Sequence, residues 1–308
     1  MKWGIALNVH EKYEQTITIS SQSDIAEIDY IWVVDFPAPR FAPSIAVKIA
    51  SMTSRPRVGI GLLPSLIYSS EYIVRFVETL TNEFGNRFDI LIGPGDKEAL
   101  RSVGKKQWVP SKIVTETIGA AQSIKHTLNE LGISCPVWVA AQGPRMIVES
   151  KKVDGVLLNL TDVSMVKWAL EILGERDSKF RVGIFSPTKM TQSYSSVPPN
   201  DFLYSTAIVA LGASRALMDR FDIKDSIESA RRMYSEQEEL SSEILEKIGI
   251  EHLLRWGFYS TPGNLVEAIG PLKESGVDTI IFGPPNSHSK SSAKLLLDAF
   301  QLYKETHQ

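Results

Sequence analysis

A short apolar run followed by a stretch of helical periodicity recurs along almost the whole chain. This alternation restricts the fold more than any other feature of the sequence. Most runs are apolar on both alternating faces, as expected of parallel strands that are covered on both sides. Eight runs fit this description: Trp3–Asn8, Ile28–Asp35, Arg57–Leu63, Phe88–Gly93, Val137–Ala141, Gly155–Leu160, Arg181–Phe185 and Thr279–Gly283. Eight strands that alternate with helices predict an α/β chain folded as a closed (β/α)₈ or TIM barrel.

The segments between these runs have apolar residues at helical spacing. Six helices are predicted over Pro43–Met52, Ser70–Phe84, Ser111–Leu131, Asp162–Leu173, Leu265–Ser275 and Ser291–Tyr303. One connection, between strands seven and eight, is far longer than the others. Within it, Leu203–Met218 and Ser226–Ile248 are also predicted to be helical. This insertion, about residues 189–255, has no linker and no strand set of its own, so we expect extra helices over the barrel mouth and one domain over 1–308.

The composition excludes several function classes. The formal net charge of −3 gives no general attraction to nucleic acid or anionic lipid. Five histidines and the lone Cys135 are too few for a Cys/His metal cluster, and one cysteine forms no internal disulfide. No run reaches the roughly 18 apolar residues of a membrane span, and the first residues lead directly into a strand without a signal peptide. The sequence predicts a cytoplasmic protein without metal, membrane or nucleic-acid partners.

In a TIM barrel the active site lies where the strands end. Strand four ends in the turn Gly93–Asp96, whose two glycines allow the backbone to approach a ligand closely, although it could equally be a plain βα turn. Strand five leads through Ala141, Gln142 and Gly143 into a helix that begins with Pro144. The free N–H groups of such a helix start are suited to a phosphate.

Two further strand ends carry groups that can transfer protons. Asp35 closes strand two at the mouth, where a carboxylate is either a catalytic or ligand-binding group or a structural cap. His288 follows strand eight in a polar loop, where it is either an acid–base group or simply solvated. Gly61, near the end of strand three, lies where a glycine often marks a bulge.

The ordered set of strand ends resembles the luciferase-like superfamily of flavin and deazaflavin barrels. Within it, the chain is most similar to the coenzyme F420-dependent methylene-tetrahydromethanopterin reductases of archaea. The matching segments keep the family order and span nearly the whole chain: Ile31–Asp35, Gly93–Lys97, Ala141–Met146, Asp154–Asn159, Thr261-Pro262, Gly276–Asp278 and Gly283–Pro285. This resemblance implies a TIM-barrel oxidoreductase that binds a phosphorylated ring cofactor, and it suggests a homodimer.

The resemblance also implies residue roles. Gly61–Leu62 takes the position of a cis peptide bond that forms a bulge behind the cofactor ring. The turn residues Gly93, Pro94, Gly95 and Asp96 line the ring pocket. Ala141, Gln142 and Gly143 bind the phosphate side of the cofactor tail. Asp35 contacts the ring edge or the surroundings of the reacting carbon.

Two positions depart from the reductase pattern. Ala6 stands in strand one where the reductases usually have glutamate, and Phe36 stands where they and many relatives have histidine after the strand-two aspartate. Both family positions are suspected of proton handling. The sequence therefore argues against methylene-tetrahydromethanopterin as the substrate. The segments that the resemblance implies to bind the cofactor are retained.

Three functional hypotheses follow. The first is an oxidoreductase that transfers a hydride between F420 and a small organic substrate, with Asp35, Asp96 or His288 transferring protons. The second is an FMN-dependent monooxygenase of the same fold. The third is a cofactor-binding paralogue without catalytic activity, for which Ala6 and Phe36 are the supporting observations.

Overall fold

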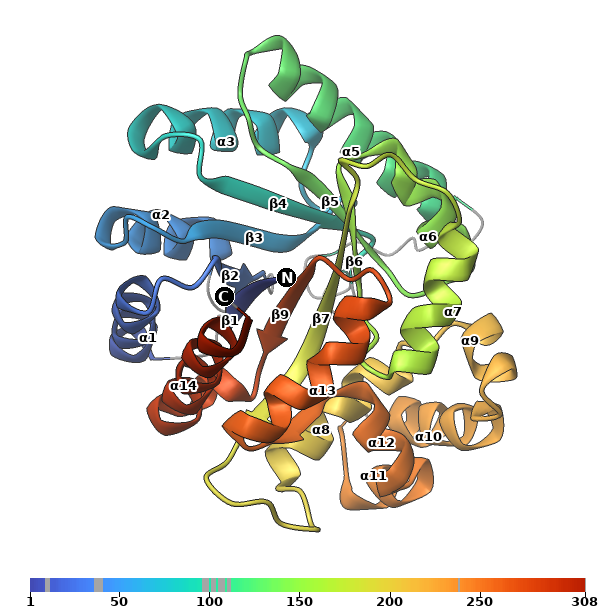
Figure 1. The fold of residues 1–308 in the computed structure, drawn as a ribbon. Coiled ribbons are helices and arrows are strands. Elements are labelled where there is room, and N and C mark those ends of the chain that lie inside the picture. The colour runs from blue at the N-terminus through green and yellow to red at the C-terminus, as the bar shows by residue number, and fades with distance from the viewer. Residues whose placement is uncertain are drawn as a thin grey trace.

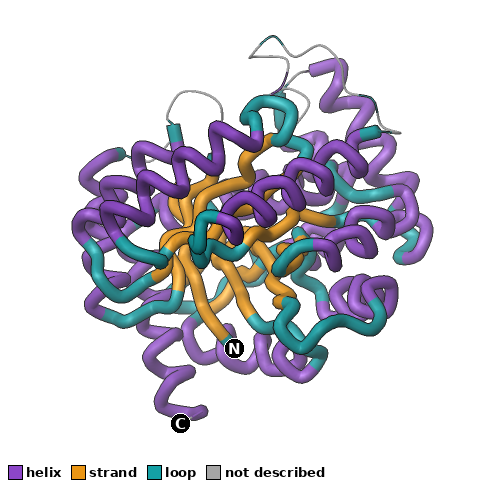
Figure 2. The backbone as a smooth tube through the Cα atoms, turned by 90° about the horizontal axis from the view of Figure 1, so that it is seen from above, coloured by secondary structure: helices purple, strands orange, loops and turns teal. Residues whose placement is uncertain are grey.

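The chain folds into a closed parallel barrel surrounded by helices (Figures 1 and 2). The computed structural model describes residues 1–8, 12–35, 41–95, 100, 104, 109, 112–237 and 239–307. The barrel strands are β1 (Lys2–Asn8), β2 (Tyr30–Val34), β3 (Arg57–Pro64), β4 (Phe88–Gly93), β5 (Val137–Ala141), β6 (Gly155–Leu158), β7 (Arg181–Met190) and β9 (Thr279–Gly283). Sequential strands pair in parallel from β1 to β7, and β9 pairs with both β7 and β1, which closes the barrel. The predicted (β/α)₈ fold is confirmed, and all eight predicted runs are barrel strands.

Helices pack around the outside of the strands. They are α1 (Tyr13–Ile25), α2 (Ala42–Met52), α3 (Ser70–Phe84), α5 (Ile113–Glu130), α6 (Pro144–Glu149), α7 (Val163–Leu173), α13 (Pro262–Glu274) and α14 (Lys290–His307). The starts of two are fixed by capping side chains. The Ser69 hydroxyl accepts a hydrogen bond from the N–H of Tyr72, and the Asp162 carboxylate accepts from two N–H groups in the first turn of α7. These bonds satisfy N–H groups that have no partner within the helix.

Helix α1 was not predicted from the sequence. Its middle, Thr16–Ser20, alternates β-branched residues and ends in serine, all weak helix formers. The helix nevertheless buries Ile19 completely in the core between the barrel and its helices. Packing against the barrel therefore outweighs the local preference of these residues.

The barrel interior is a packed core. Seven buried residues from six strands pack together there: Ala6, Tyr30, Trp32, Leu91, Trp138, Leu157 and Ile281. We call this set the inner core. Glycine makes room for its largest members, because a Cβ atom added to Gly59 would lie 2.1 Å from Cδ2 of Trp32. The interior is thus closed by side chains, as is usual for such barrels.

The long connection after β7 forms α8 (Asn200–Leu211), α9 (Arg215–Arg220), α10 (Lys224–Gln237), α11 (Ser242–Ile248), α12 (Ile250–Leu253) and the short strand β8 (Phe258–Ser260). These helices gather on one side of the barrel in Figure 1. Strand β7 continues five residues beyond its predicted end and pairs with β8. The helix predicted over 203–218 is two helices, because α8 ends at Gly212 and the Ser214 hydroxyl caps α9. That the whole chain forms one domain stays a prediction.

Three 3₁₀ turns complete the structure: η1 (Ser150–Lys152), η2 (Leu254–Trp256) and η3 (Asn286–His288). None of the helices in the described ranges is long and apolar enough to cross a membrane. Within the same ranges, no group of three or more His, Cys, Asp or Glu residues is placed to hold a metal ion.

Candidate active site at the barrel mouth

Most of the predicted site residues converge at the carboxyl ends of four neighbouring strands. These residues close or directly follow β2, β3, β4 and β5: Asp35, Gly61, Leu62, Gly93, Pro94, Gly95, Ala141, Gln142 and Gly143. Parallel strands end on one rim, so residues far apart in the sequence share one site. Asp96 and Phe36 lie outside the described residues. Ala6 lies within β1 and is completely buried in the inner core.

A bulge ends β3. The register between β3 and β4 shifts between Ile60 and Leu63, and the Gly61–Leu62 peptide bond is cis, as the resemblance implies. Gly61 has a φ of +146°, and a Cβ atom there would lie 2.5 Å from the carbonyl oxygen of Leu91. Only glycine fits this backbone. The bulge turns the Leu62 side chain onto the inner core.

The glycines of the strand-four turn make room for β3. A Cβ atom on Gly93 would lie 2.2 Å from Cδ1 of Leu62, and one on Gly95 would lie 2.9 Å from Cβ of Pro64. Gly95 also has a φ of +81°, a left-handed conformation that favours glycine. Contacts within the protein therefore explain both glycines, and they place Leu62 directly over the turn.

Asp35 is attached to this bulge. Its backbone N–H donates to the carbonyl oxygen of Gly61 at 3.3 Å. The side chain is only 6% exposed; Oδ2 accepts from the Tyr68 hydroxyl at 2.8 Å and Oδ1 from the N–H of Ala42 at 3.3 Å. Asp35 thus also supports the first residue of α2, in line with the structural alternative raised by the sequence.

The pKa of the Asp35 carboxyl distinguishes this residue from an ordinary helix-capping aspartate. Burial raises the pKa of the Asp35 carboxyl, and the hydrogen bonds from Tyr68 and Ala42 offset only part of that rise. Among the described residues no cation forms an ion pair with it. A buried carboxyl with neutral donors can hold or release a proton at the mouth.

Tyr68 was missed by sequence reasoning. It lies in the turn after β3, where no periodicity marks it, and only the preceding Pro64 and following Ser69 signal a change of direction. Its ring stacks on Tyr72, with centroids 6.0 Å apart, and approaches Phe41 at 6.2 Å. Burial, followed by the neighbouring Asp35 charge, raises the pKa of Tyr68, so the phenol stays protonated and donates to Asp35.

The end of β5 is held by the insertion. Nε2 of Gln142 donates to the carbonyl oxygens of Asn159 at 3.2 Å and Val209 at 3.3 Å, which links β5 to the residue after β6 and to α8. The Gln142 amide nitrogen is therefore already engaged in the protein. Gly143 precedes the six-residue helix α6, and a Cβ atom there would lie 3.3 Å from Cβ of Ser214.

His288 lies in η3 after β9 and is exposed, whereas Asp35 is buried. The structure therefore places two of the three predicted acid–base residues in different environments, and the third, Asp96, lies outside the described residues. Two neighbours of His288 were not singled out from the sequence. Asn286 and Ser287 are completely buried, and Nδ2 of Asn286 and Oγ of Ser287 have no hydrogen-bond partner among the described residues.

The residues at the mouth fit a flat ring with a polar edge. Half-buried Val34, Leu62, Ala140 and Phe185 pack on the inner core and form an apolar surface at its upper end. Near it, Oδ1 of Asn159 is buried and has no hydrogen-bond partner among the described residues. Ligand sites typically combine such an apolar surface with a few polar atoms.

Solved structures of F420-dependent enzymes and of an enzyme in complex with FMN share the overall fold of this chain. No family model matches the sequence. The coenzyme F420-dependent tetrahydromethanopterin reductase from Methanopyrus kandleri superposes with a TM-score of 0.80 at 16% identity, and 97% of each chain is covered.

Two other solved structures show the range of cofactors on this fold. An F420-dependent secondary alcohol dehydrogenase, in complex with an F420–acetone adduct, has a TM-score of 0.72 at 11% identity over 98% of each chain. The oxygenating constituent of 3,6-diketocamphane monooxygenase from Pseudomonas putida, in complex with FMN, has a TM-score of 0.63 at 11% identity, covering 97% of this chain and 96% of that one. What these proteins share with this chain is the fold.

Proposed function

We propose that this chain is an oxidoreductase that transfers a hydride between coenzyme F420 and a small organic substrate at the barrel mouth. One observation carries the proposal: the Gly61–Leu62 bulge seats Leu62 over Gly93, and the carbonyl oxygen of Gly61 accepts from the backbone N–H of Asp35, whose buried carboxyl group has no cationic partner among the described residues. The fold shared with two F420-dependent enzymes supports the choice of cofactor.

In this proposal the chain binds and orients the cofactor. The apolar surface around Leu62 supports the ring, the turn Gly93, Pro94, Gly95 and Asp96 borders it, and Asn159 offers its free oxygen to a ring N–H. The backbone of Ala141, Gln142 and Gly143 faces the phosphate side of the tail. When bound, F420 supplies or accepts the hydride.

Asp35 and Tyr68 handle the proton that accompanies hydride transfer. Tyr68 donates to Oδ2 of Asp35, which fixes the carboxyl orientation, and burial favours the protonated acid. A carboxyl with a raised pKa stays protonated at higher pH than an exposed one, so it has a proton available for a developing alkoxide or amine. Asp96 and His288 are the other two proposed proton carriers.

The proposed substrate is not methylene-tetrahydromethanopterin. Ala6 lies completely buried in the inner core, at the position where a glutamate is usual in the reductases. A small alcohol, ketone or imine, whose turnover needs one proton carrier, suits a site whose described acid is Asp35. A second candidate is an FMN-dependent monooxygenase, favoured by the fold shared with an FMN complex.

Titration of the purified protein with F420 and with FMN tests the proposal, followed by hydride exchange with a panel of alcohols, imines and enones. We expect saturable F420 binding and exchange with at least one compound. If neither cofactor binds, the proposal fails. Tight FMN with oxygen consumption would instead establish the monooxygenase, and stoichiometric F420 without exchange would establish an inactive paralogue. Native mass spectrometry of the same sample tests the proposed homodimer.

A further inference from the structure

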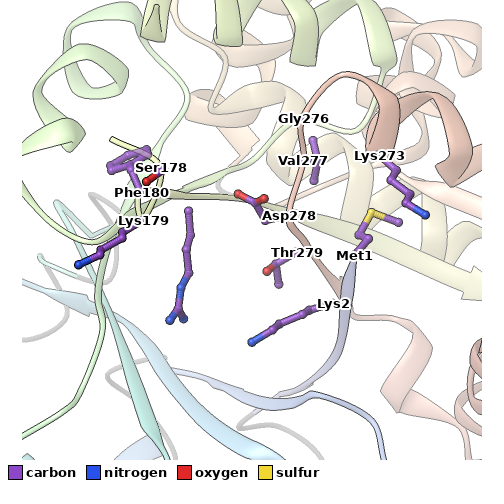
Figure 3. A pocket seen from close by; sticks show the side chains of 11 residues that line it. Met1, Lys2, Ser178, Lys179, Phe180, Lys273, Gly276, Val277, Asp278 and Thr279 are labelled. Atoms are coloured by element: carbon purple, nitrogen blue, oxygen red, sulfur yellow. The ribbon is translucent and has the colours of Figure 1, made fainter. Parts of the chain in front are cut away.

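A hollow lies at the opposite end of the barrel from the mouth. It has a volume of about 680 Å³ and opens at the amino-terminal ends of β1, β7 and β9 (Figure 3). Its polar and charged lining includes Lys2, Lys179, Arg181, Lys273, Asp278 and Thr279. In Figure 3, Lys179 and Lys273 lie on opposite sides, with Asp278, Thr279 and Lys2 between them.

Three lysines line this hollow, Lys2, Lys179 and Lys273, and none of them forms an ion pair with a described residue. The lysine ion pairs of the described residues lie elsewhere in the molecule. Lys2 instead places Nζ 5.6 Å from the ring centre of Tyr30, and Lys273 places it 5.7 Å from that of Tyr303. The one carboxylate in the lining, Asp278, already accepts from the N–H of Val182 at 2.7 Å.

The floor of the hollow adds to this surplus. Arg181 points toward Asp89 inside the barrel, but its Nη1 is 3.8 Å from that carboxylate. Arg57 lies closer to the same carboxylate, with Nε 2.5 Å from Oδ1. One buried carboxylate thus serves two guanidinium groups, and the lining of the hollow holds three lysines and Arg181 against the single carboxylate of Asp278. The whole chain has more acidic than basic residues, 36 against 33, so this concentration of cations is local.

A buried hydroxyl gives an independent indication of a ligand. Thr279 lines the hollow and is only 2% exposed, and its Oγ1 has no hydrogen-bond partner among the described residues. A buried hydroxyl without a partner costs free energy, which an oxygen atom of a bound ligand would recover. Thr279 is paired in register with Lys2 and lines the same hollow as Arg181, so such an oxygen would also meet positive charge.

We propose that this hollow binds a small organic phosphate. Ammonium and guanidinium groups are the usual partners of phosphate oxygens. The volume lies within the range of about 300–1,000 Å³ that is common for small-molecule sites. Phe180 and Val277 add apolar lining for the organic part of the ligand. The site is separate from the mouth and does not depend on the function proposed for it.

Isothermal titration with AMP, with adenosine as the neutral control, tests the phosphate requirement in the intact protein at low salt. We expect saturable binding of AMP and none of adenosine. The double variant Lys179→Ala/Lys273→Ala should weaken AMP binding by about tenfold or more, because two charge-assisted contacts are lost. The matched control Lys247→Ala/Lys294→Ala removes two exposed lysines elsewhere and should change it less than about twofold.

Amide chemical shifts locate the binding. AMP should move the signals of Lys179, Arg181 and Thr279 and leave that of Gly143 at the mouth in place. Absence of AMP binding, equal binding of adenosine, shifts confined to the mouth, or an equal loss in the control variant would each overturn the proposal. Both double variants change exposed side chains, so circular dichroism should confirm that they fold.

Discussion

Two buried carboxylates lie at opposite ends of the same barrel, and their surroundings differ in one respect. Asp89, within β4, is completely buried; it accepts from Nε of Arg57 at 2.5 Å and from Nε1 of Trp138 at 2.8 Å. Asp35, after β2 at the mouth, is almost as buried, but its donors are the neutral Tyr68 hydroxyl and a backbone N–H. Asp89 has a cationic partner, and Asp35 has none among the described residues.

The difference separates a structural carboxylate from a reactive one. Burial raises the pKa of both groups, but at Asp89 the charges and hydrogen bonds of Arg57 and Trp138 work against that rise. Asp89 links Arg57, Arg181 and Trp138 at the amino-terminal end of the barrel. Tyr30 lies at the same end, and burial raises its pKa to about 12. Asp35 keeps an unbalanced group at the mouth, which is typical of sites where protons are moved.

Replacing Asp89 should have the largest effect, and it should act on stability. Asp89→Ala leaves Arg57 and Arg181 without their shared carboxylate and Trp138 without its acceptor. We expect a loss of about 3–5 kcal/mol in the free energy of unfolding, the range for breaking a buried ion pair. Urea unfolding measures it, with the exposed Asp298→Ala as control, expected within about 0.5 kcal/mol. A loss as small as the control's would mean that the two carboxylates do not differ as argued.

Replacing Asp35 should instead act on activity. Asp35→Asn keeps the size of the side chain and an acceptor for Tyr68 but removes the proton carrier. Hydride transfer with F420 should fall about a hundredfold, the lower end for loss of a general acid or base. F420 affinity, measured by fluorescence titration, should change little. Full activity in this variant would remove Asp35 from the proposed mechanism.

The stability of Asp35→Asn should depend on pH. Because the folded-state pKa of Asp35 is raised, the contribution of this group to stability is fully present below its unfolded pKa and is lost as pH rises through the folded pKa. Asparagine does not titrate, so the melting temperature of the variant minus that of the wild type should increase from acidic to neutral pH. Thermal melts of both proteins at acidic and neutral pH check the sign; a difference that stays constant or falls as pH rises would contradict it.

The sequence predicted the barrel and the position of its mouth because both follow from local patterns. Apolar runs locate buried parallel strands, and the carboxyl ends of such strands must meet, which brought Asp35, Gly61 and Gly93 together in advance. The Asp89, Arg57 and Arg181 cluster was not foreseen, since an inward side chain is recognised only from strand register. Tyr68 was not foreseen because its turn has no periodic pattern.

Two glycines extend the comparison to packing. Gly155 lies at the start of β6, where a Cβ atom would meet the carbonyl oxygen of Arg181 and Cε3 of Trp138, both at 2.8 Å. Gly93 at the mouth would meet the flexible end of Leu62. Gly155→Ala should cost about 1–3 kcal/mol of stability, as overpacking does.

Gly93→Ala should cost less stability but weaken F420 binding about tenfold by displacing Leu62. If Gly93→Ala instead cost the larger stability and Gly155→Ala weakened F420 binding, the proposed difference between the two ends of the barrel would be wrong.

The smallest effect concerns Tyr68. Tyr68→Phe removes the hydrogen bond that favours the ionised form of Asp35, so the pKa of Asp35 should rise further. Activity at its optimum should fall only a few-fold, roughly the value of one hydrogen bond, while the limb of the pH–rate profile assigned to Asp35 moves to higher pH. Carboxyl ¹³C NMR of the cofactor-free protein should show the same shift.

Tyr72→Phe is the matched control for this experiment. Tyr72 stacks on Tyr68 but its hydroxyl makes no hydrogen bond to Asp35, so the control removes one phenol hydroxyl from the same aromatic group. It should leave both the pH–rate limb and the Asp35 titration in place. If both variants shift the titration equally, the aromatic surroundings set the proton affinity of Asp35, and the direct bond from Tyr68 does not. A shift in Tyr68→Phe alone establishes that the neutral donor tunes a carboxyl that no cation in the described structure balances.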